Sequence, residues 1–166
     1  MIAPKNARRL RPNMPHYGVM PDKVDAMLTW DWVEERLHEA HKYWVCSVRA
    51  DSRPHCVPVW GAWVEGTLYF GTDRKSVKAR NFARENRIVL HLDSGDEAVI
   101  IEGNVVEAKV SQPLLKRIGE RYIEKYVLDP ELEDSGDLLL CVIPQKVMAW
   151  LESDYPATAT YWLFDV

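Results

Sequence analysis

The sequence is poor in cysteine, in long apolar runs and in excess positive charge. Its cysteines, Cys46, Cys56 and Cys141, are odd in number and lack a CxxC spacing, which predicts a chain kept reduced in the cytoplasm. No apolar run approaches the roughly 20 residues of a membrane span, so we expect no membrane partner. The 21 basic and 25 acidic residues give a net charge of −4, which argues against binding the phosphate backbone of nucleic acids.

The charge that is present is unevenly distributed. Residues 74–84 contain five basic side chains and no acid, so the rest of the chain carries −9; the five are Arg74, Lys75, Lys78, Arg80 and Arg84. A short cationic segment on an otherwise acidic protein predicts a small, localised anionic partner. The chain has 166 residues, 47% of them hydrophobic, which is enough for one domain with its own core.

The first 20 residues are basic, free of acids and rich in proline. They contain no apolar segment of the kind that a secretory signal needs. We therefore expect residues 1–28 to form an N-terminal arm that is loosely ordered or wraps a partner subunit. Residues 29–166 are expected to form the domain.

Alternating apolar and polar residues predict a mainly β protein with a few helices. Helices are expected from Asp31, over 76–86 and after Ser111. The predicted strands cover residues 44–48, 55–64, 67–72, 88–94, 98–110, 138–151 and 160–166. Six or seven strands separated by turn signals every 8–12 residues favour an antiparallel split barrel.

The cationic segment follows the strand 67–72 and opens the helix 76–86. Ser76 can cap this helix, whose free N–H groups and positive dipole end suit a phosphate. A helical wheel places Arg74, Lys78 and Asn81 on one face. The pattern alone fits a solvated basic helix face equally well.

The strand 55–64 contains Pro58 in its middle and Gly61 near its end. A proline breaks the hydrogen-bond ladder and a glycine lets another group approach closely. A planar heteroaromatic ring could therefore lie along Pro58–Gly61, although an ordinary barrel edge with a bulge explains the same residues.

Several segments together carry a resemblance to a known family, in their order and spacing rather than in any one motif. They are residues 55–61 (HCVPVWG), 68–72 (LYFGT), 75–81 (KSVKARN), 87–92 (RIVLHL), 99–103 (VIIEG) and 159–162 (ATYW). About two-thirds of the chain resembles the pyridoxamine 5′-phosphate oxidase-like flavin-binding split barrels. It is most similar to their branch that uses the deazaflavin coenzyme F-420.

This resemblance implies a homodimer with two cofactor sites at the subunit interface. Strand residues Val57, Pro58, Val59 and Trp60 would lie along the cofactor ring, with Trp162 nearby. The residues that would hold the cofactor phosphate are Thr72, Lys75, Ser76, Lys78 and Asn81. The implied function is an oxidoreductase that transfers a hydride between coenzyme F-420, or FMN, and a small organic substrate. The alternative is a non-catalytic flavin, deazaflavin or haem carrier of the same fold.

The chain departs from the family's phosphate oxidases at three positions, the first of which is Val77, where the resemblance leads us to expect the arginine of an Arg–Lys pair at the helix start. Cys56 and Gly61 stand where the resemblance leads us to expect an arginine and a lysine, which favours the deazaflavin over FMN. No acid–base pair is evident, so no catalytic residue is assigned. We expect no metal site, because His55, Cys56 and Cys46 lack the ligand spacing of zinc sites.

Overall fold

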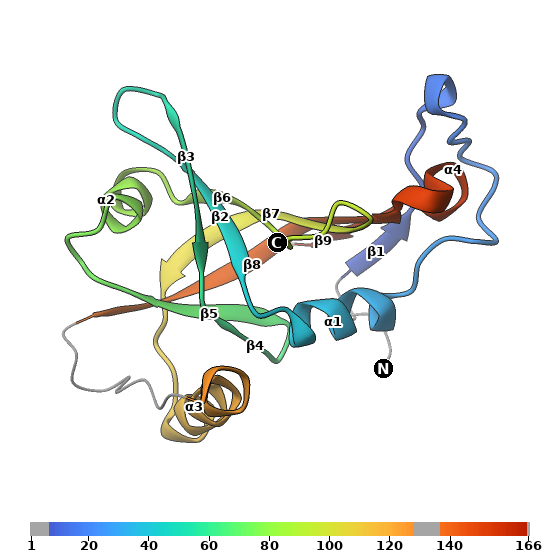
Figure 1. Cartoon of the computed structure of the whole chain (residues 1–166). Helices are drawn as coiled ribbons and strands as arrows, with labels where there is room; N and C mark the ends of the chain where they lie inside the picture. Colours follow the sequence, from blue (N-terminus) through green and yellow to red (C-terminus); the bar gives the residue numbers. More distant parts are fainter. Residues whose placement is uncertain (1–6, 128–136, 166) are drawn as a thin grey trace.

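The computed structural model describes residues 7–127 and 137–165, and these contain nine strands in one antiparallel sheet (Figure 1). The strands are β1 (Ala7–Leu10), β2 (Tyr43–Val48), β3 (Pro54–Val59), β4 (Ala62–Val64), β5 (Thr67–Thr72), β6 (Arg87–His91), β7 (Glu97–Glu107), β8 (Leu138–Leu151) and β9 (Thr160–Phe164). The α-helices are α1 (Trp30–Glu39), α2 (Val77–Arg84), α3 (Gln112–Tyr126) and α4 (Tyr155–Thr158). Short 3-10 turns, η1 (Pro15–Tyr17) and η2 (Glu152–Asp154), complete the description. None of the described helices has the length and hydropathy that crossing a bilayer requires.

The sheet is open, because within the described chain β1, β3 and β4 each pair with only one other strand. Its strand order is β1-β9-β8-β7-β6-β2-β3, while β5 pairs with β8 and with β4. The start of β8 pairs with β5 and its end pairs with β9, so β8 belongs to both halves of the sheet. Within the described chain β3 pairs only with β2, which leaves its other edge free. The predicted mainly β split barrel is confirmed.

Two glycines shape the sheet where another backbone passes close by. A Cβ on Gly103 would lie 2.2 Å from the carbonyl oxygen of Ile143, at the register shift between β7 and β8 opposite Pro144. A Cβ on Gly61 would lie 2.8 Å from Leu68 Cδ1 and 2.9 Å from the carbonyl oxygen of Tyr69. No side chain fits at either position without displacing its neighbours.

The structure has more strands than the six or seven expected. The predicted strand 55–64 is two strands, β3 and β4, because the chain leaves the ladder at Trp60–Gly61. The cap of α1 is Thr29, whose hydroxyl accepts from the Trp32 amide, and not Asp31 as its sequence position suggested. The short α4 was not predicted.

The described part of the N-terminal arm lies against the sheet. β1 pairs with β9, from Ala7 opposite Phe164 to Leu10 opposite Tyr161. The buried guanidinium of Arg11 donates to four backbone carbonyls, those of Met20, Pro156, Ala157 and Ala159. These bonds tie the arm to α4, and its role on a partner subunit stays a prediction.

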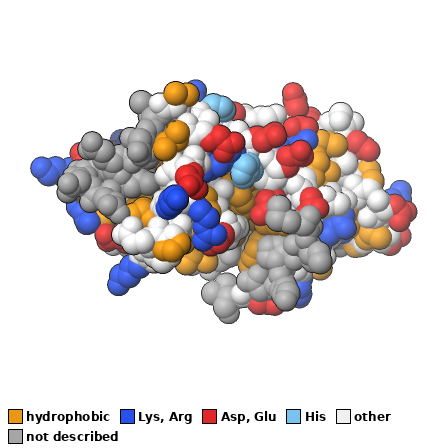
Figure 2. Space-filling view, turned by 90° about the horizontal axis from the view of Figure 1, so that it is seen from below, with side chains coloured by type: hydrophobic (Ala, Val, Ile, Leu, Met, Phe, Trp, Pro, Cys, Tyr) orange, Lys and Arg blue, Asp and Glu red, His pale blue; other side chains and the backbone are white. Residues whose placement is uncertain are grey.

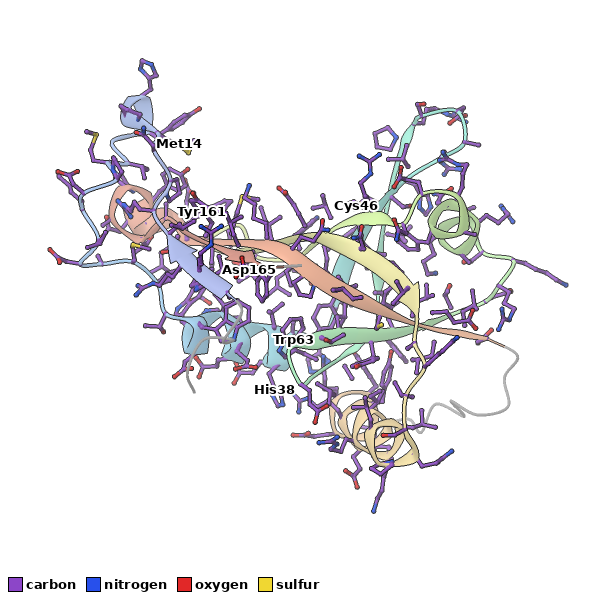
Figure 3. The ribbon with its side chains drawn as sticks, turned by 180° about the vertical axis from the view of Figure 1, so that it is seen from behind. Met14, His38, Cys46, Trp63, Tyr161 and Asp165 are labelled. Atoms are coloured by element: carbon purple, nitrogen blue, oxygen red, sulfur yellow. The ribbon has the colours of Figure 1, made fainter. Side chains whose placement is uncertain are left out.

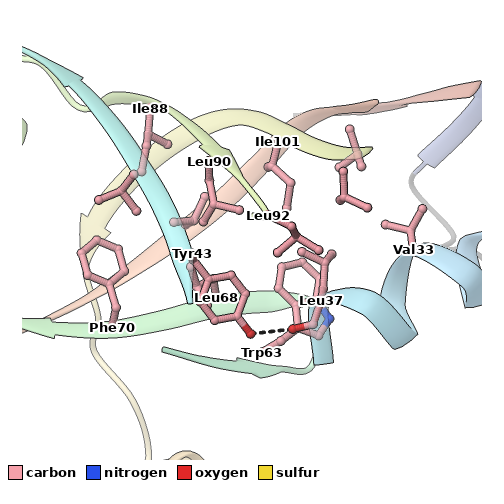
Figure 4. Packing of buried hydrophobic residues seen from close by; sticks show 14 of the residues in the cluster. Val33, Leu37, Tyr43, Trp63, Leu68, Phe70, Ile88, Leu90, Leu92 and Ile101 are labelled. Atoms are coloured by element: carbon pink, nitrogen blue, oxygen red, sulfur yellow. Dashed lines mark hydrogen bonds between the residues drawn. The ribbon is translucent and has the colours of Figure 1, made fainter. Parts of the chain in front are cut away.

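The main core lies between the curved sheet and α1 (Figure 4). Leu37 of α1 and Tyr43 of β2 are fully buried in it, and the Tyr43 hydroxyl donates to the Leu37 carbonyl at 2.5 Å. Each such large apolar side chain contributes about 1.5–3 kcal/mol by burial. A smaller cluster, built on Ile118 and Tyr122, holds α3 against β4 and β5. In the main cluster Val59 of β3 is buried, and Val57 of the same strand packs against it.

Candidate cofactor site

The junction between β5 and α2 brings two hydroxyl groups to the start of a helix. Thr72 ends β5, and its Oγ1 lies 3.0 Å from Oγ of Ser76. Ser76 is the N-cap of α2 and accepts from the Ala79 amide at 3.1 Å, as its sequence position predicted. The first turn of the helix adds backbone N–H donors and a positive dipole end. Together these groups form a cradle suited to an oxyanion.

The five cations of residues 74–84 have different surroundings. Arg74 pairs with Glu107 at 3.1 Å. Arg80 and Arg84 donate to the backbone carbonyls of Lys75 and Val48. Within residues 7–127 and 137–165, the ammonium groups of Lys75 and Lys78 have no carboxylate partner. The two lysines at the helix start are therefore the ones available to an anion.

Asn81 is placed behind the cradle and not in it. It is buried, and its Nδ2 donates to Oγ of Ser47 at 2.9 Å. The same Ser47 hydroxyl lies 3.4 Å from Nδ1 of His55 on β3. Asn81 thus joins α2 to β2 and β3, and its link to a bound phosphate would be indirect.

His55 is a site residue that the sequence analysis did not assign. Partial burial lowers the pKa of its imidazole, and the positive charges of Arg49 and Lys78 lower it further. The available signal was the alternation of His55 with Val57 and Val59 along one face of the strand.

The four expected ring-contacting residues lie along or just beyond β3. Pro58 is exposed, Val57 is half-buried, and Val59 is 7% exposed and packs into the main core. Trp60 is 49% exposed and follows the end of the strand, where its ring stacks on Tyr126 of α3 at a centroid separation of 4.6 Å. The strand therefore runs from the anion cradle at His55 to an aromatic stack at Trp60.

A buried lysine lies at this second end of β3. Nζ of Lys125 donates to the Tyr43 hydroxyl at 3.0 Å and to the Gly61 carbonyl at 2.9 Å. Burial lowers the pKa of Lys125 to about 7, and the charge of Arg121 contributes to the decrease. Sequence reasoning missed this residue, although it interrupts the apolar face of α3 one turn after Tyr122.

A match to a known family covers the segment that builds this site. The family model described as pyridoxamine 5′-phosphate oxidase matches residues 29–151, from the cap of α1 to the end of β8. The chain belongs to the pyridoxamine 5′-phosphate oxidase family. No curated protein matches the chain significantly.

Solved structures similar to this pyridoxamine 5′-phosphate oxidase family member differ in what their names say they bind. A conserved hypothetical protein from Mycobacterium tuberculosis is 20% identical, with a TM-score of 0.64 over 76% of this chain and 87% of that chain. A protein named F420 reductase is 19% identical, with a TM-score of 0.53 over 69% of this chain and 94% of that chain. The haem storage protein HutZ from Vibrio cholerae is 12% identical, with a TM-score of 0.58 over 70% of this chain and 91% of that chain. At these identities the similarity establishes the fold alone.

Trp162 lies outside the segment that matches the family. It is fully buried in the main core, edge-to-face with Trp30 at 5.6 Å between ring centroids. Its indole has no exposed surface with which to contact a cofactor in this chain. Trp162 therefore packs in the core between β9 and α1, and its place near a cofactor stays a prediction.

A separate groove of about 1030 Å³ lies between α1 and α3 and contains none of the expected cofactor residues. Most of its charged lining is acidic, and Figure 2, which views the molecule from the α3 side, shows acidic side chains grouped on this face. Carboxylates repel a phosphate. The α2 cradle is therefore the better anion site in this family member.

Proposed function

We propose that the protein is an oxidoreductase of the pyridoxamine 5′-phosphate oxidase family that binds coenzyme F-420, with FMN as the alternative cofactor. It would transfer a hydride between this cofactor and a small organic substrate. The observation that carries the proposal is the α2 cradle, where two hydroxyls 3.0 Å apart adjoin a helix N-terminus and two lysines without ion-pair partners in the described chain.

The cradle suits the phosphate of such a cofactor. Thr72 and Ser76 would donate hydroxyl hydrogen bonds, and Lys75 and Lys78 would donate charge-assisted ones. Each bond to a charged group is worth about 1.5–3 kcal/mol. Asn81 would act through Ser47, by holding α2 against β2.

The free edge of β3 suits the cofactor ring. Val57 and Val59 stiffen the strand, while Pro58 removes one backbone donor and presents an apolar surface. Trp60 would border the ring at the end remote from the phosphate. The cofactor supplies the hydride chemistry, and the chain binds it, orients it and excludes water.

A second copy of the chain would complete the site. Four large apolar side chains are 37–47% exposed on strands of the sheet, namely Val48, Val89, Val106 and Ile143. Exposed apolar surface of this kind favours an interface between subunits. We therefore propose a homodimer with one cofactor per subunit at the interface.

The preference for coenzyme F-420 over FMN rests on the residues of β3 and its end. Cys56 and Gly61 stand where the resemblance leads us to expect cationic side chains. Cys56 has no cationic group, and no side chain fits at Gly61. The fold similarity to the F420 reductase agrees with this preference. The fold similarity to HutZ keeps haem as the ligand of a non-catalytic alternative.

Native mass spectrometry with F-420, FMN or haem added separately tests the proposal. We expect a dimer that retains two molecules of F-420 and binds FMN more weakly. Retention of haem alone would instead support a carrier, and retention of none of the three would overturn the cofactor assignment.

A further inference from the structure

Two thiols and an imidazole lie together on the outer face of the sheet, away from the α2 cradle. Cys46 of β2 and Cys56 of β3 are direct partners in the strand register, and their sulfurs are 2.8 Å apart. His91 comes from the neighbouring strand β6, where it lies opposite Trp44. The three potential ligand atoms all lie within 4.8 Å of one another. Figure 3 shows Cys46 on the sheet, well separated from His38 and Trp63 near α1 and α3.

The sheet itself brings these residues to one face. Alternate residues of a strand share a face, so Trp44, Cys46 and Val48 point away from the core while Tyr43 and Val45 point into it. Cys56 is exposed, whereas Cys46 and His91 are half-buried. Sequence spacing could not reveal the set, because His91 follows Cys56 by 35 residues and only the β2–β6 pairing brings it close.

The imidazole of His91 makes outer contacts of the kind that metal-binding histidines make. Its Nδ1 lies 2.8 Å from the carbonyl oxygen of Leu92, and a carbonyl can only accept, so Nδ1 carries the proton. The lone pair is then on Nε2. The Trp44 indole lies parallel to the imidazole ring, at 5° between planes, and is held by a hydrogen bond to Asp93. Such outer contacts fix the tautomer and direction of a ligating histidine.

We propose that Cys46, Cys56 and His91 bind a zinc ion through two thiolates and one imidazole, with the fourth coordination position left for water or a small ligand. Zinc takes such nitrogen and sulfur ligands, and sites with three protein ligands keep the fourth position open. Two zinc–sulfur bonds of about 2.3 Å would set the sulfurs about 3.8 Å apart. The thiols therefore need to separate by about 1 Å, which the exposed Cys56 side chain can provide.

The binding step involves no electron transfer. One Zn²⁺ displaces a proton from each of the two thiols, so two protons are released and the bound ion with its two thiolates is neutral. The site uses none of the α2 residues, so the zinc proposal and the phosphate assignment are tested on different side chains.

The test is zinc and cobalt titration of the full-length protein, reduced with a phosphine and kept free of oxygen. We expect one zinc per chain in competition with a chelator. Cobalt should give thiolate charge-transfer bands together with the intense visible bands of a tetrahedral site. Cys46→Ser, Cys56→Ser and His91→Gln should each weaken zinc binding at least ~100-fold, since even loss of an outer contact costs 10–100-fold.

Cys141→Ser and His16→Gln serve as matched controls and should bind zinc as the unchanged protein does. Thermal unfolding without metal shows whether each variant is folded, and added zinc should raise the Tm of only those variants that keep all three ligands. Zinc binding unaffected by the three ligand substitutions, or a cobalt spectrum without thiolate bands, would overturn the proposal. A Cys46–Cys56 disulfide that persists when the protein is prepared with the phosphine reductant and zinc would also overturn the proposal.

Discussion

The two ends of β3 use lysine in opposite ways. At the α2 end, Lys75 is exposed, Lys78 is half-buried, and neither has a carboxylate partner in the described chain. At the α3 end, Lys125 is 8% exposed and donates to a hydroxyl and a carbonyl. The first pair is not engaged by a carboxylate of the described chain and is available to an anion. The second is satisfied internally, and its environment disfavours the charge.

This contrast suggests how one strand can carry a cofactor without a conventional catalytic pair. Binding energy would come from Lys75 and Lys78, which have no carboxylate partner in the described chain and can donate charge-assisted hydrogen bonds to a ligand. Rigidity would come from the buried lysine, which joins α3 to the backbone of Gly61.

The largest effect is expected from Lys125→Met, measured as the pH dependence of unfolding. The pKa of Lys125 is lowered to about 7 in the folded protein. In the unfolded chain a lysine has a pKa of about 10.4. The unfolded state therefore binds more protons between these values, so the free energy of unfolding rises with pH, by up to about 1.4 kcal/mol per unit. In the Lys125→Met variant the free energy of unfolding should not show this rise with pH.

Urea unfolding at pH 7, 8 and 9 measures this slope. Lys116→Met, on the solvent side of the same helix, should keep the slope of the unchanged protein, because Lys116 is exposed. Equal slopes for Lys125→Met and the unchanged protein would show that Lys125 is charged in the folded state throughout this range.

The next largest effect is expected from Ser76→Ala combined with Lys78→Ala. Removing one hydroxyl and one ammonium from the cradle should weaken F-420 binding at least tenfold, or about 1.4 kcal/mol. A fluorescence titration measures this. Thr29→Ala with Lys116→Ala is the matched control, because it also removes one helix cap and one exposed lysine. Unchanged affinity in the first double variant would refute the phosphate assignment.

Trp60→Leu should have a smaller effect on stability. Its stack on Tyr126 is worth about 0.5–1.5 kcal/mol beyond apolar burial. If Trp60 also borders the cofactor ring, the substitution should weaken F-420 binding while inorganic phosphate binds as before. Calorimetry with F-420 and with inorganic phosphate measures the two affinities separately. Weaker binding of inorganic phosphate by Trp60→Leu would show that Trp60 affects the phosphate site at the other end of β3.

The smallest effect is expected at His55. Burial and the charges of Arg49 and Lys78 lower its pKa in the free protein. A bound phosphate adds negative charge nearby, so the pKa should rise, and Lys78→Ala should raise it in the free protein too. NMR titration of the histidine ring signals measures both shifts. A pKa that does not change on cofactor binding would place the phosphate elsewhere.

Much of the fold could be predicted from local signals. Period-two hydropathy located most strands, and Ser76 at the start of a basic helix correctly indicated the cap of α2. The division of the strand 55–64 was missed, because its cause is non-local: Gly61 is approached by Leu68 and Tyr69 of β5. The pairing of β1 with β9 was missed for the same reason, since it joins the two ends of the chain.

In the candidate site, too, some residues could be found from local sequence signals and others could not. Thr72, Ser76 and Lys78 lie within seven residues, so their grouping was visible in the sequence. His55 and Lys125 reach the site only through tertiary packing across tens of residues. Asn81 lay on the predicted helix face, but its amide turns toward Ser47, a partner on β2 that helical periodicity cannot indicate.

A crystal structure of the protein with F-420 bound would locate the cofactor phosphate. We expect the phosphate within hydrogen-bond distance of the Ser76 hydroxyl and the Lys78 ammonium, with the ring along the free edge of β3. A phosphate bound anywhere else, such as the groove between α1 and α3, would contradict this expectation.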